Sequence, residues 1–343
     1  MANSYFKTLT TNDRTESRTL LHENIPITGT LLSGTYATAA SGREINVKVF
    51  SHGMFQSVYD YPYASSSANH ILDLSVGFSS NAASLSSAAV SQKSKKINVY
   101  TQMAQILNGY DTEGAIKVFD ADGDFGSGTK HHNAIFINFS RLLTKDEIKK
   151  GSFSMVLGTA SAFASPFGQL ATITDKAATS SYKVNSPAGE YGILKNGATS
   201  VGLIYYQAGV AVLTSSAFNN SSEINAAGKT INKLLTGSTV DATADGLRHR
   251  IKNISFNNTT ELNSSIYFCR AAHNEFNYSS NPTYLSASEI VVKNGEPLNN
   301  PRSYVTTVGL YSPDNELMAV AKVSEPLRKD PTNELTLRVR LDY

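Results

Sequence analysis

Tryptophan is absent from the 343 residues, cysteine occurs once, and charged residues make up only 17 % of the chain. The single cysteine, Cys269, excludes an internal disulfide. No apolar run reaches the ~18 residues that a membrane-spanning helix needs, and MANSYFKTLTTNDR at the start lacks the apolar stretch of a signal peptide. A formal net charge of +2 gives no basis for bulk nucleic-acid binding. We therefore expect neither a membrane nor a nucleic acid as partner.

Short runs of alternating apolar and polar residues fill most of the chain, separated by stretches rich in Ser, Thr, Asn and Gly. Such alternation is typical of strands, and helical periodicity is rare. Strands do not alternate with helices as a parallel βαβ fold requires. The sequence therefore predicts a mainly β protein with a few helices (α+β), built from antiparallel sheets. The predicted strands are 45–50, 71–78, 116–119, 133–139, 152–157, 169–174, 190–195, 201–206, 210–214, 250–256, 264–270 and 289–293.

The clearest strand pattern lies at 335–343. Its residues are predicted to face a core at Leu335, Leu337, Val339, Leu341 and Tyr343. The opposite face, which carries Arg338 and Arg340, is predicted to meet water or a partner. Pro313-Asp314-Asn315 separates two further apolar runs, and the second places four residues on one side: Leu317, Ala319, Ala321 and Val323. These strands predict a β-sandwich-like module at the C-terminal end.

Three segments have helical patterns. The segment Asn98–Asn108 places Val99, Met103, Ile106 and Leu107 on one face and is followed by Gly109. Thr144–Lys150 starts with a capping box formed by its first residue and Glu147. Ser222–Leu235 is the third. A tight hairpin is predicted where Gln207-Ala208-Gly209 joins the strands Val201–Tyr206 and Val210–Thr214.

The predicted organisation has four parts. Residues 1–43 have too few apolar residues to form a core and are predicted to be an extended arm. This arm either crosses a neighbouring subunit or wraps its own domain. Residues 44–214 form an α+β domain, 215–247 a junction rich in Ser, Asn and Gly with one helix, and 248–343 the β-sandwich-like module.

The most specific candidate for a metal site is the acidic loop Asp120-Ala121-Asp122-Gly123-Asp124. Spaced carboxylates are the ligands that Ca²⁺ prefers. The EF-hand pattern, however, needs Gly at loop position six and Glu at position twelve, and these places hold Phe125 and His131. The alternative that we favour is a turn between two strands in which Asp120, Asp122 and Asp124 bind backbone groups. The neighbouring His131 and His132 would point to opposite strand faces, which disfavours a shared zinc ion.

Two groups of residues are candidates for protein interfaces. Tyr59, Tyr61 and Tyr63 are clustered, and tyrosine is common at interfaces; the alternative is packing at the rim of the chain's own sheet. Arg248 and Arg250 belong to a basic cluster that would contact a neighbouring subunit or cover a solvated strand edge. Arg338 and Arg340 on the terminal strand complete the set of interface candidates.

No motif assigns a catalytic role. There is no G-x-S-x-G elbow and no Walker A loop, and Cys269 lies in the apolar run IYFCRAA, where a small core residue is the simplest interpretation. We expect no enzyme activity and no cofactor. Glycosidase carboxylate pairs have no recognisable spacing in sequence, so this class stays open.

Several segments carry a resemblance to a known family. They are GMFQSVYDYPYASSSANHILDLSVG (53–77), KKINVYTQMAQILNGYDTEGAIKVFDADGD (95–124), NFSRLLTKDEIKKGSFSMVLG (138–158), the pair EYGIL and VGLIYYQAGVAVLT within 190–214, and VGLYSPDNELMAVAKVSEPLRK (308–329). Together, from about Arg43 onward, the chain resembles virion structural proteins of T4-like marine myoviruses. The last segment is similar to a hairpin in tail-collar and baseplate-attached proteins of contractile-tailed bacteriophages.

This resemblance implies a structural component of a contractile phage tail, located at the baseplate or the appendage-attachment region and assembled in the host cytoplasm. Its partners would be other virion proteins and copies of itself in a symmetric assembly. The alternatives are a neck or head–tail connector component, and a receptor- or glycan-binding tail protein with hydrolase activity.

Overall fold

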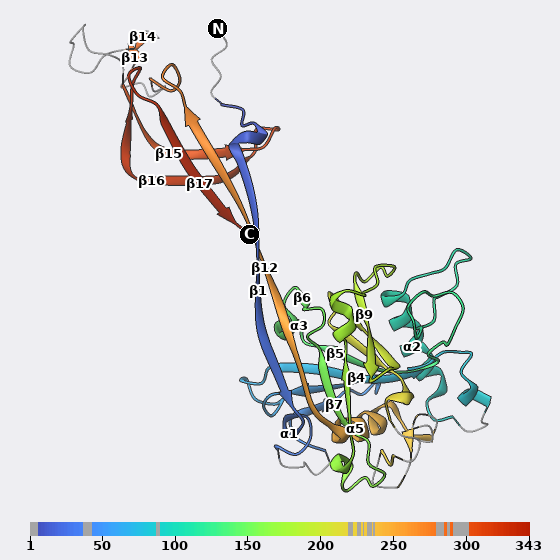
Figure 1. Cartoon of the computed structure of the whole chain (residues 1–343). Coiled ribbons are helices and arrows are strands. Elements are labelled where there is room, and N and C mark those ends of the chain that lie inside the picture. The colour runs from blue at the N-terminus through green and yellow to red at the C-terminus, as the bar shows by residue number, and fades with distance from the viewer. Residues whose placement is uncertain are drawn as a thin grey trace. The chain divides into compact units, whose positions relative to one another are not determined.

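The computed structural model describes residues 6–36, 43–86, 90–218, 222–224, 228, 230–231, 235, 237–278, 285–286, 289–290 and 302–343. The chain divides into two compact units, and each is described here by itself (Figure 1). Unit 1 comprises Met1–Thr19 and Glu261–Tyr343, and unit 2 comprises Leu20–Thr260. The strands β1 (Arg14–Thr28) and β12 (Ile251–Ala271) each contribute residues to both units.

The fold is mainly β, as the sequence predicts, with 43 % of residues in strands against 18 % in helices. In unit 2 one antiparallel sheet has the strand order β12-β7-β8-β9-β10-β11-β5-β4-β3-β2, and β6 pairs separately with β12. Its strands other than β12 are β2 (Val47–Val49), β3 (Gln56–Tyr59), β4 (His70–Phe78), β5 (Asn133–Phe139), β6 (Glu147–Ile148), β7 (Ser154–Gly158), β8 (Leu170–Thr174), β9 (Tyr191–Asn196), β10 (Thr199–Tyr205) and β11 (Val210–Leu213).

The hairpin of β10 and β11 confirms the prediction for 201–214. Tyr205 pairs with Val210 and Gly202 with Leu213. Gly209 has φ +67°, a backbone conformation that suits glycine, and its N–H donates to Tyr205 O over 2.9 Å. The loop that joins the two strands therefore has glycine at its left-handed position, where a residue with a Cβ would be strained.

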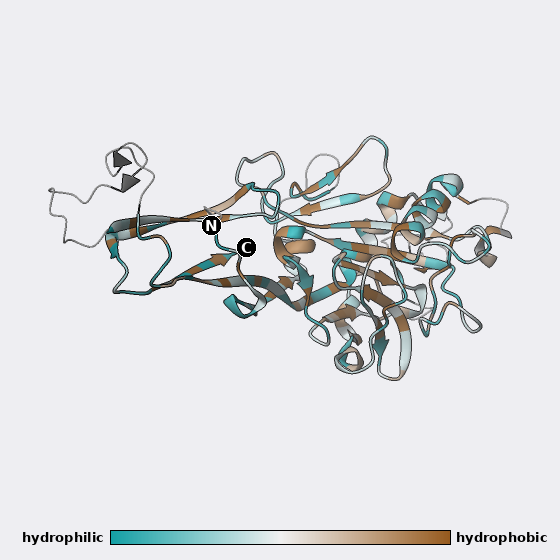
Figure 2. Ribbon diagram, turned by 90° about the horizontal axis from the view of Figure 1, so that it is seen from above, coloured by the Kyte–Doolittle hydropathy of each residue, from teal (hydrophilic) through white to brown (hydrophobic). Residues whose placement is uncertain are grey.

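Both faces of the unit 2 sheet are covered by hydrophobic side chains. Alternate residues of β5 point to opposite faces and pack into different clusters. Ile135 and Ile137 pack into one hydrophobic cluster, whereas Ala134 and Phe136 pack into another. Helix α2 (Lys93–Leu107) packs on β4 and supplies Val99 and Leu107 to the second cluster. Helix α5 (Val240–Arg250) adds its apolar side chains to the first. Figure 2 shows hydrophobic residues, in brown, along the strands of the sheet.

The helices agree with the predictions in part. Helix α2 contains most of the predicted Asn98–Asn108 and ends before Gly109 (φ +72°), but Ile106 is 65 % exposed rather than core-facing. The predicted helix Thr144–Lys150 is wrong. Helix α3 (Arg141–Thr144) ends before Lys145, which has φ +55°, and β6 follows. The prediction missed the start of this helix at Ser140, whose Oγ accepts a hydrogen bond from the N–H of the second helical residue.

Helix α5 was not predicted and replaces the start of the predicted strand 250–256. Its N-cap is Thr239, whose side chain accepts a hydrogen bond from Ala242 N. The predicted helix Ser222–Leu235 lies largely outside the described residues, as does the strand 289–293. The remaining helical segments are α1 (Gly29–Leu32) and the 3₁₀ turns η1 (Thr11–Asp13), η2 (Ala83–Ser86), η3 (Pro166–Gly168), η4 (Lys176–Thr179) and η5 (Ser215–Ala217).

Besides the pairing of β1 with β12, unit 1 contains two larger antiparallel pairings. Strand β17 (Leu335–Asp342) pairs with residues 264–271 of β12, with Ser264 opposite Asp342 and Ala271 opposite Leu335. Strands β15 (Ser303–Tyr311) and β16 (Leu317–Lys329) form a separate two-stranded sheet. Two short strands, β13 (Leu285–Ser286) and β14 (Glu289–Ile290), pair with each other.

The predicted alternation of the terminal strand is confirmed, but the strand is only partly covered. Val339 is 6 % exposed and is the only fully buried apolar side chain among the described residues of unit 1. Leu335, Leu337 and Leu341 are half-buried, and the polar residues that alternate with them, at positions 336, 338, 340 and 342, are exposed. Tyr343 is 70 % exposed, so its assignment to the core is wrong.

Strand β1 is hydrogen-bonded to β12 of the same chain. In unit 1 the Arg14 guanidinium lies over the Tyr267 ring, and in unit 2 the Glu23 N–H donates to Asn258 Oδ1. Partner numbers fall as strand numbers rise, so the pair is antiparallel. Of the two predicted paths for residues 1–43, the described part therefore follows the chain's own sheets.

The unit boundaries differ from the four predicted parts. The N-terminal segment does not stand apart as an arm, because Ile27 and Leu32 are buried in the unit 2 core. The predicted junction 215–247 and the predicted start of the C-terminal module at 248 both fall inside unit 2. Residues 240–250 belong to unit 2 because the apolar side chains of α5 pack into the first hydrophobic cluster of that unit.

None of the helices in the described residues is both long enough and apolar enough to span a membrane.

Candidate functional site

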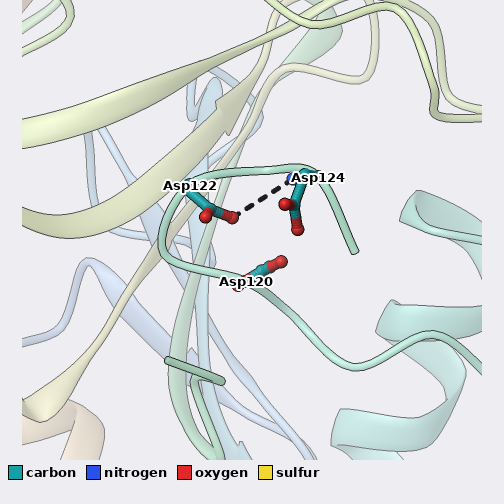
Figure 3. Close-up of side chains that lie close together, drawn as sticks. All are labelled: Asp120, Asp122 and Asp124. Atoms are coloured by element: carbon teal, nitrogen blue, oxygen red, sulfur yellow. Dashed lines mark hydrogen bonds between the residues drawn. The ribbon is translucent and has the colours of Figure 1, made fainter. Parts of the chain in front are cut away.

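The acidic loop brings its three carboxylates together, with ligand oxygens all within 4.8 Å of one another (Figure 3). The bridge between Asp120 and Lys130 closes the loop. Asp120 is fully buried, and its carboxylate accepts hydrogen bonds from Lys130 Nζ and Phe125 N, both over 2.9 Å. Asp122 and Asp124 are exposed and accept from backbone N–H groups of the same loop.

Hydrogen bonds within the loop, together with one ammonium group, stabilise its carboxylates. Burial raises the pKa of the Asp120 carboxyl, and the Lys130 ammonium opposes that rise. A hydrogen bond from the Asp124 N–H lowers the pKa of Asp122. Phe125 (φ +60°) and Gly123 (φ +72°) give the backbone its tight path. The geometry fits the favoured prediction of an Asp-rich turn. The Lys130 ammonium is paired with the Asp120 carboxylate, which a bound cation would also have to contact.

The two histidines after the loop have different surroundings, as expected for neighbours on an extended segment. His132 Nδ1 lies 2.7 Å from Ser79 Oγ. His131 is buried, and burial lowers its pKa to about 4. Its Nε2 has no hydrogen-bond partner in the described part of the chain. The two rings therefore form no common ligand pair.

The tyrosine loop presents two of its three rings to solvent. Tyr61 is 50 % and Tyr63 is 47 % exposed, whereas Tyr59 is half-buried. The Tyr59 ring lies 6.5 Å from Tyr63 and 5.6 Å from His70 between centroids. His70 Nε2 is 2.8 Å from Asp73 Oδ1, and this hydrogen bond raises the pKa of His70. The exposure of Tyr61 and Tyr63 is compatible with an interface, which stays a prediction.

Arg248 and Arg250 are corrected from interface candidates to interior residues, since they are 2 % and 0 % exposed. Arg250 donates to five carbonyl oxygens: those of Gly158, Ala160, Ser161, Ala162 and Glu223. Arg248 donates to Glu44 Oε2 and Asp245 Oδ1, both over 2.9 Å, and to Leu32 O. Both guanidinium groups hold loops to the last turn of α5 and cannot reach a neighbouring chain.

Arg338 and Arg340 lie on the exposed face of β17, as predicted. Arg340 Nε donates to Asp342 Oδ1 over 2.7 Å. This pair is exposed and contributes little to stability. The interface role of both arginines stays a prediction.

A further candidate surface lies on the β15–β16 hairpin and was not predicted. We define the hairpin patch as Tyr311, Leu317, Met318 and Val320, which are 47 %, 53 %, 69 % and 53 % exposed. The predicted placement of Leu317 beside Ala319 is wrong, because the register shifts between Leu310 and Tyr311. Leu317 therefore lies opposite Tyr311. The consecutive Leu317 and Met318, which break the alternation, are the sequence signal of this irregularity.

The patch is continuous with two further features. Phe6 makes an edge-on contact with Tyr311, with 4.9 Å between ring centroids. Tyr311 and Leu317 lie over Gly309, where an added Cβ would approach them to 2.9 Å and 3.3 Å. A side chain at Gly309 would displace both, so the glycine allows these apolar groups to meet across the strands.

Two other features limit the chemistry of the described residues. A surface depression of about 280 Å³ in unit 1 is lined by Glu16, Ser17, Arg18, Asn263, Ser264 and Tyr343. It contains a single carboxylate, whereas glycosidases of the usual type use two. Burial raises the pKa of the half-buried Cys269 thiol, which makes it a poor nucleophile.

Comparison with known proteins returned no relative: no protein-family model matches the sequence, and neither a curated protein nor a solved structure matches it.

Proposed function

We propose that the chain is a structural component of a contractile bacteriophage tail, at the baseplate or the appendage-attachment region, with no enzymatic role. It would act by assembling with copies of itself and with other virion proteins. One observation supports assembly most directly. Unit 1 is built of long strands, yet among its described residues it fully buries one apolar side chain, Val339.

The energetics of unit 1 favour additional cover by other chains. Ordering the backbone costs about 1–2 kcal/mol per residue, and fully burying an aliphatic side chain returns about 1.5–3 kcal/mol. The inward faces of β16 and β17 are only half-buried, at residues such as Ala321, Val323 and Leu337. Neighbouring subunits that cover these faces would supply the missing stabilisation.

The strand edges of unit 1 support the same proposal. Strands β15 and β16 form a sheet of two, so each has an edge without a strand partner in the described residues. Among the described strands, β17 pairs only with β12. Monomeric proteins usually protect such edges, and assembling proteins use them to add strands from neighbours.

The phage assignment is tested on particles. Antibodies raised against the chain should label the tails of purified contractile-tailed particles in negatively stained preparations, at the baseplate end. Mass spectrometry of the same particles should detect the protein in a constant ratio to the tail-tube subunit. Labelling at the head–tail junction would favour the neck or connector alternative. Absence of the protein from washed particles would contradict a structural role in the virion.

A further inference from the structure

We propose that Asn196 is a site of spontaneous covalent modification, at which the side-chain amide is lost and the residue becomes aspartate or isoaspartate. The site lies on the β9–β10 hairpin of unit 2, and the inference goes beyond the proposed function without depending on it. The chain contains three Asn-Gly pairs, which begin at positions 108, 196 and 294. The last lies outside the described residues, and the other two have opposite surroundings.

The reaction needs only water besides the chain itself. The backbone nitrogen of Gly197 loses its proton to solvent and attacks the side-chain carbonyl carbon, Cγ, of Asn196. A bond forms between these atoms, the bond from Cγ to Nδ2 breaks, and Nδ2 takes up a proton and leaves as ammonia. Water then opens the resulting cyclic imide at either carbonyl, which gives aspartate or isoaspartate. No atom is oxidised or reduced.

The attacking nitrogen is unobstructed. Gly197 and Ala198 join β9 to β10, and Asn196 pairs with Thr199 at the end of the ladder. Gly197 has φ +60°, as the first central residue of a type II′ turn requires. Its N–H donates to no acceptor in the described part of the chain, and a Cβ added to it would meet no atom within 4 Å. No hydrogen bond therefore has to break before this nitrogen can attack.

The amide that is attacked is unobstructed as well. Asn196 is exposed, and its side chain makes no hydrogen bond to any residue that the structure describes. It is the last residue of β9, at the tip of the hairpin. Opening the end of a strand ladder at the surface costs little free energy. The rotation that brings Gly197 N to Asn196 Cγ therefore disturbs only the end of the ladder.

The pair Asn108-Gly109 has the same chemical groups, but hydrogen bonds hold both of them in place. Asn108 is 1 % exposed, its Nδ2 donates to Lys117 O over 3.1 Å, and its Oδ1 accepts from the Tyr205 hydroxyl. The Gly109 N–H donates to Ala104 O over 3.2 Å at the end of α2. Attack here would break these bonds beside the second hydrophobic cluster, to which Ala104 and Tyr205 belong. The fold therefore protects position 108 and leaves position 196 reactive.

Conversion changes the hairpin in two ways. Either product has a carboxylate, which is charged at neutral pH, in place of a neutral amide. Isoaspartate also lengthens the main chain, because the backbone then runs through the side-chain carbon. Asn196 pairs with Thr199 of β10 on one side and with Ile173 of β8 on the other. The added atom would therefore disturb both pairings at this end of the sheet.

Peptide mapping of the whole chain tests the proposal. The folded protein is incubated at mildly alkaline pH, circular dichroism checks that it stays folded, and fragmentation in the mass spectrometer locates each amide that has become an acid. Asn196 should convert steadily. Asn108 should convert roughly a hundredfold more slowly, because it reacts only from an opened state that the stability of the core makes rare. In urea the two positions should convert at similar rates, since the fold no longer distinguishes them.

Two variants identify the reacting groups. Gly197→Ala should slow conversion at position 196, because a Cβ hinders the approach of the nitrogen. The same comparison in urea does not depend on how well the variant folds. Asn196→Gln should abolish conversion at this position on the same time scale, because attack would have to close a larger ring. Asn108 is the matched control within each variant and should convert as in the wild type.

The outcomes decide the proposal independently of the phage role. Loss of the amide at position 196 in the folded chain, with Asn108 intact, supports it. An Asn196 amide that persists in the folded chain but is lost in urea would overturn it. Equal conversion at positions 196 and 108 in the folded chain would also overturn it. Presence or absence of the protein in purified tails changes none of these results.

Discussion

Arg250 Nη1 donates a hydrogen bond to the carbonyl oxygen of Gly158 over 2.9 Å, in the interior of unit 2. Four more carbonyl oxygens surround the same guanidinium, from residues 160, 161, 162 and 223. Buried carbonyl groups without a donor are costly, so one side chain stabilises both the end of β7 with the turn that follows it and the segment around Glu223. This arginine is therefore a structural element of the fold.

Arg250→Met should lower the free energy of unfolding by about 3–5 kcal/mol, because it leaves several buried carbonyl oxygens without donors. Urea denaturation followed by circular dichroism measures the change. Arg338→Met is the matched control, and as an exposed substitution it should stay within about 0.5 kcal/mol of the wild type. Similar values for the two variants would contradict the interior role of Arg250.

The Lys96 ammonium gives unit 2 a pH dependence. It is fully buried, donates to Ser238 O over 2.6 Å and to Leu235 O, and lies 5.7 Å from the centre of the Phe78 ring. Burial lowers its pKa from 10.5 to about 8. Between these values the unfolded chain holds a proton that the folded chain has released, so stability should rise with pH.

Lys96→Met removes this titration. The free energy of unfolding of the wild type relative to the variant should increase from pH 8 to pH 10.5, by at most ~3 kcal/mol. The two carbonyl acceptors favour the charged form and reduce the gain. Other titrating groups cancel in the comparison. A relative stability that stays flat or falls over this window would show that Lys96 titrates normally.

The acidic loop should be indifferent to calcium. Because Asp120 is already paired with Lys130, neither EDTA nor millimolar Ca²⁺ should shift the thermal midpoint. Asp120→Asn should destabilise unit 2 through loss of this pair, whereas Asp122→Asn, at an exposed site, should have little effect. A clear upward shift with Ca²⁺ in the wild type, lost in Asp122→Asn, would instead establish a cation site.

Substitutions at two adjacent residues of β17, Arg338 and Val339, distinguish an effect on folding from an effect on the surface. Val339→Asp places a charge at the buried position of the strand and should loosen its pairing with β12, which hydrogen exchange of residues 264–271 would detect. Arg338→Asp changes the opposite face and should leave that exchange unchanged. Equal exchange in both variants would mean that the strand is not held by its inward face.

The sequence could predict those features that depend on neighbouring residues. The alternation of Leu335, Leu337 and Val339, the β10–β11 hairpin and the body of α2 all follow from spacing within one element. The gathering of Asp120, Asp122 and Asp124 is likewise local, since all three belong to one loop. The mainly β class follows from the sum of such segments.

Features that depend on distant residues could not be predicted. Arg250 is buried because carbonyl groups about 90 positions earlier surround it, and nothing near it in sequence indicates them. The neutralisation of Asp120 depends on Lys130 lying opposite it across a bridge. The exposure of the hairpin patch depends on whether other parts of the chain pack against it, and an alternating strand pattern does not show whether they do.

The division of unit 1 into two separate stretches of sequence has a consequence for synthesis. Residues 14–19 leave the ribosome about 240 residues before Glu261, which at about 5–20 residues per second is a delay on the order of 10–50 s. Unit 2 is synthesised during that time, and the early strand segment has no β12 segment to join. A chain whose translation stops before Glu261 also has no β16 edge. Such fragments would lack the half-buried faces of β16 and β17, so interrupted translation products could not take part in the assembly that we propose.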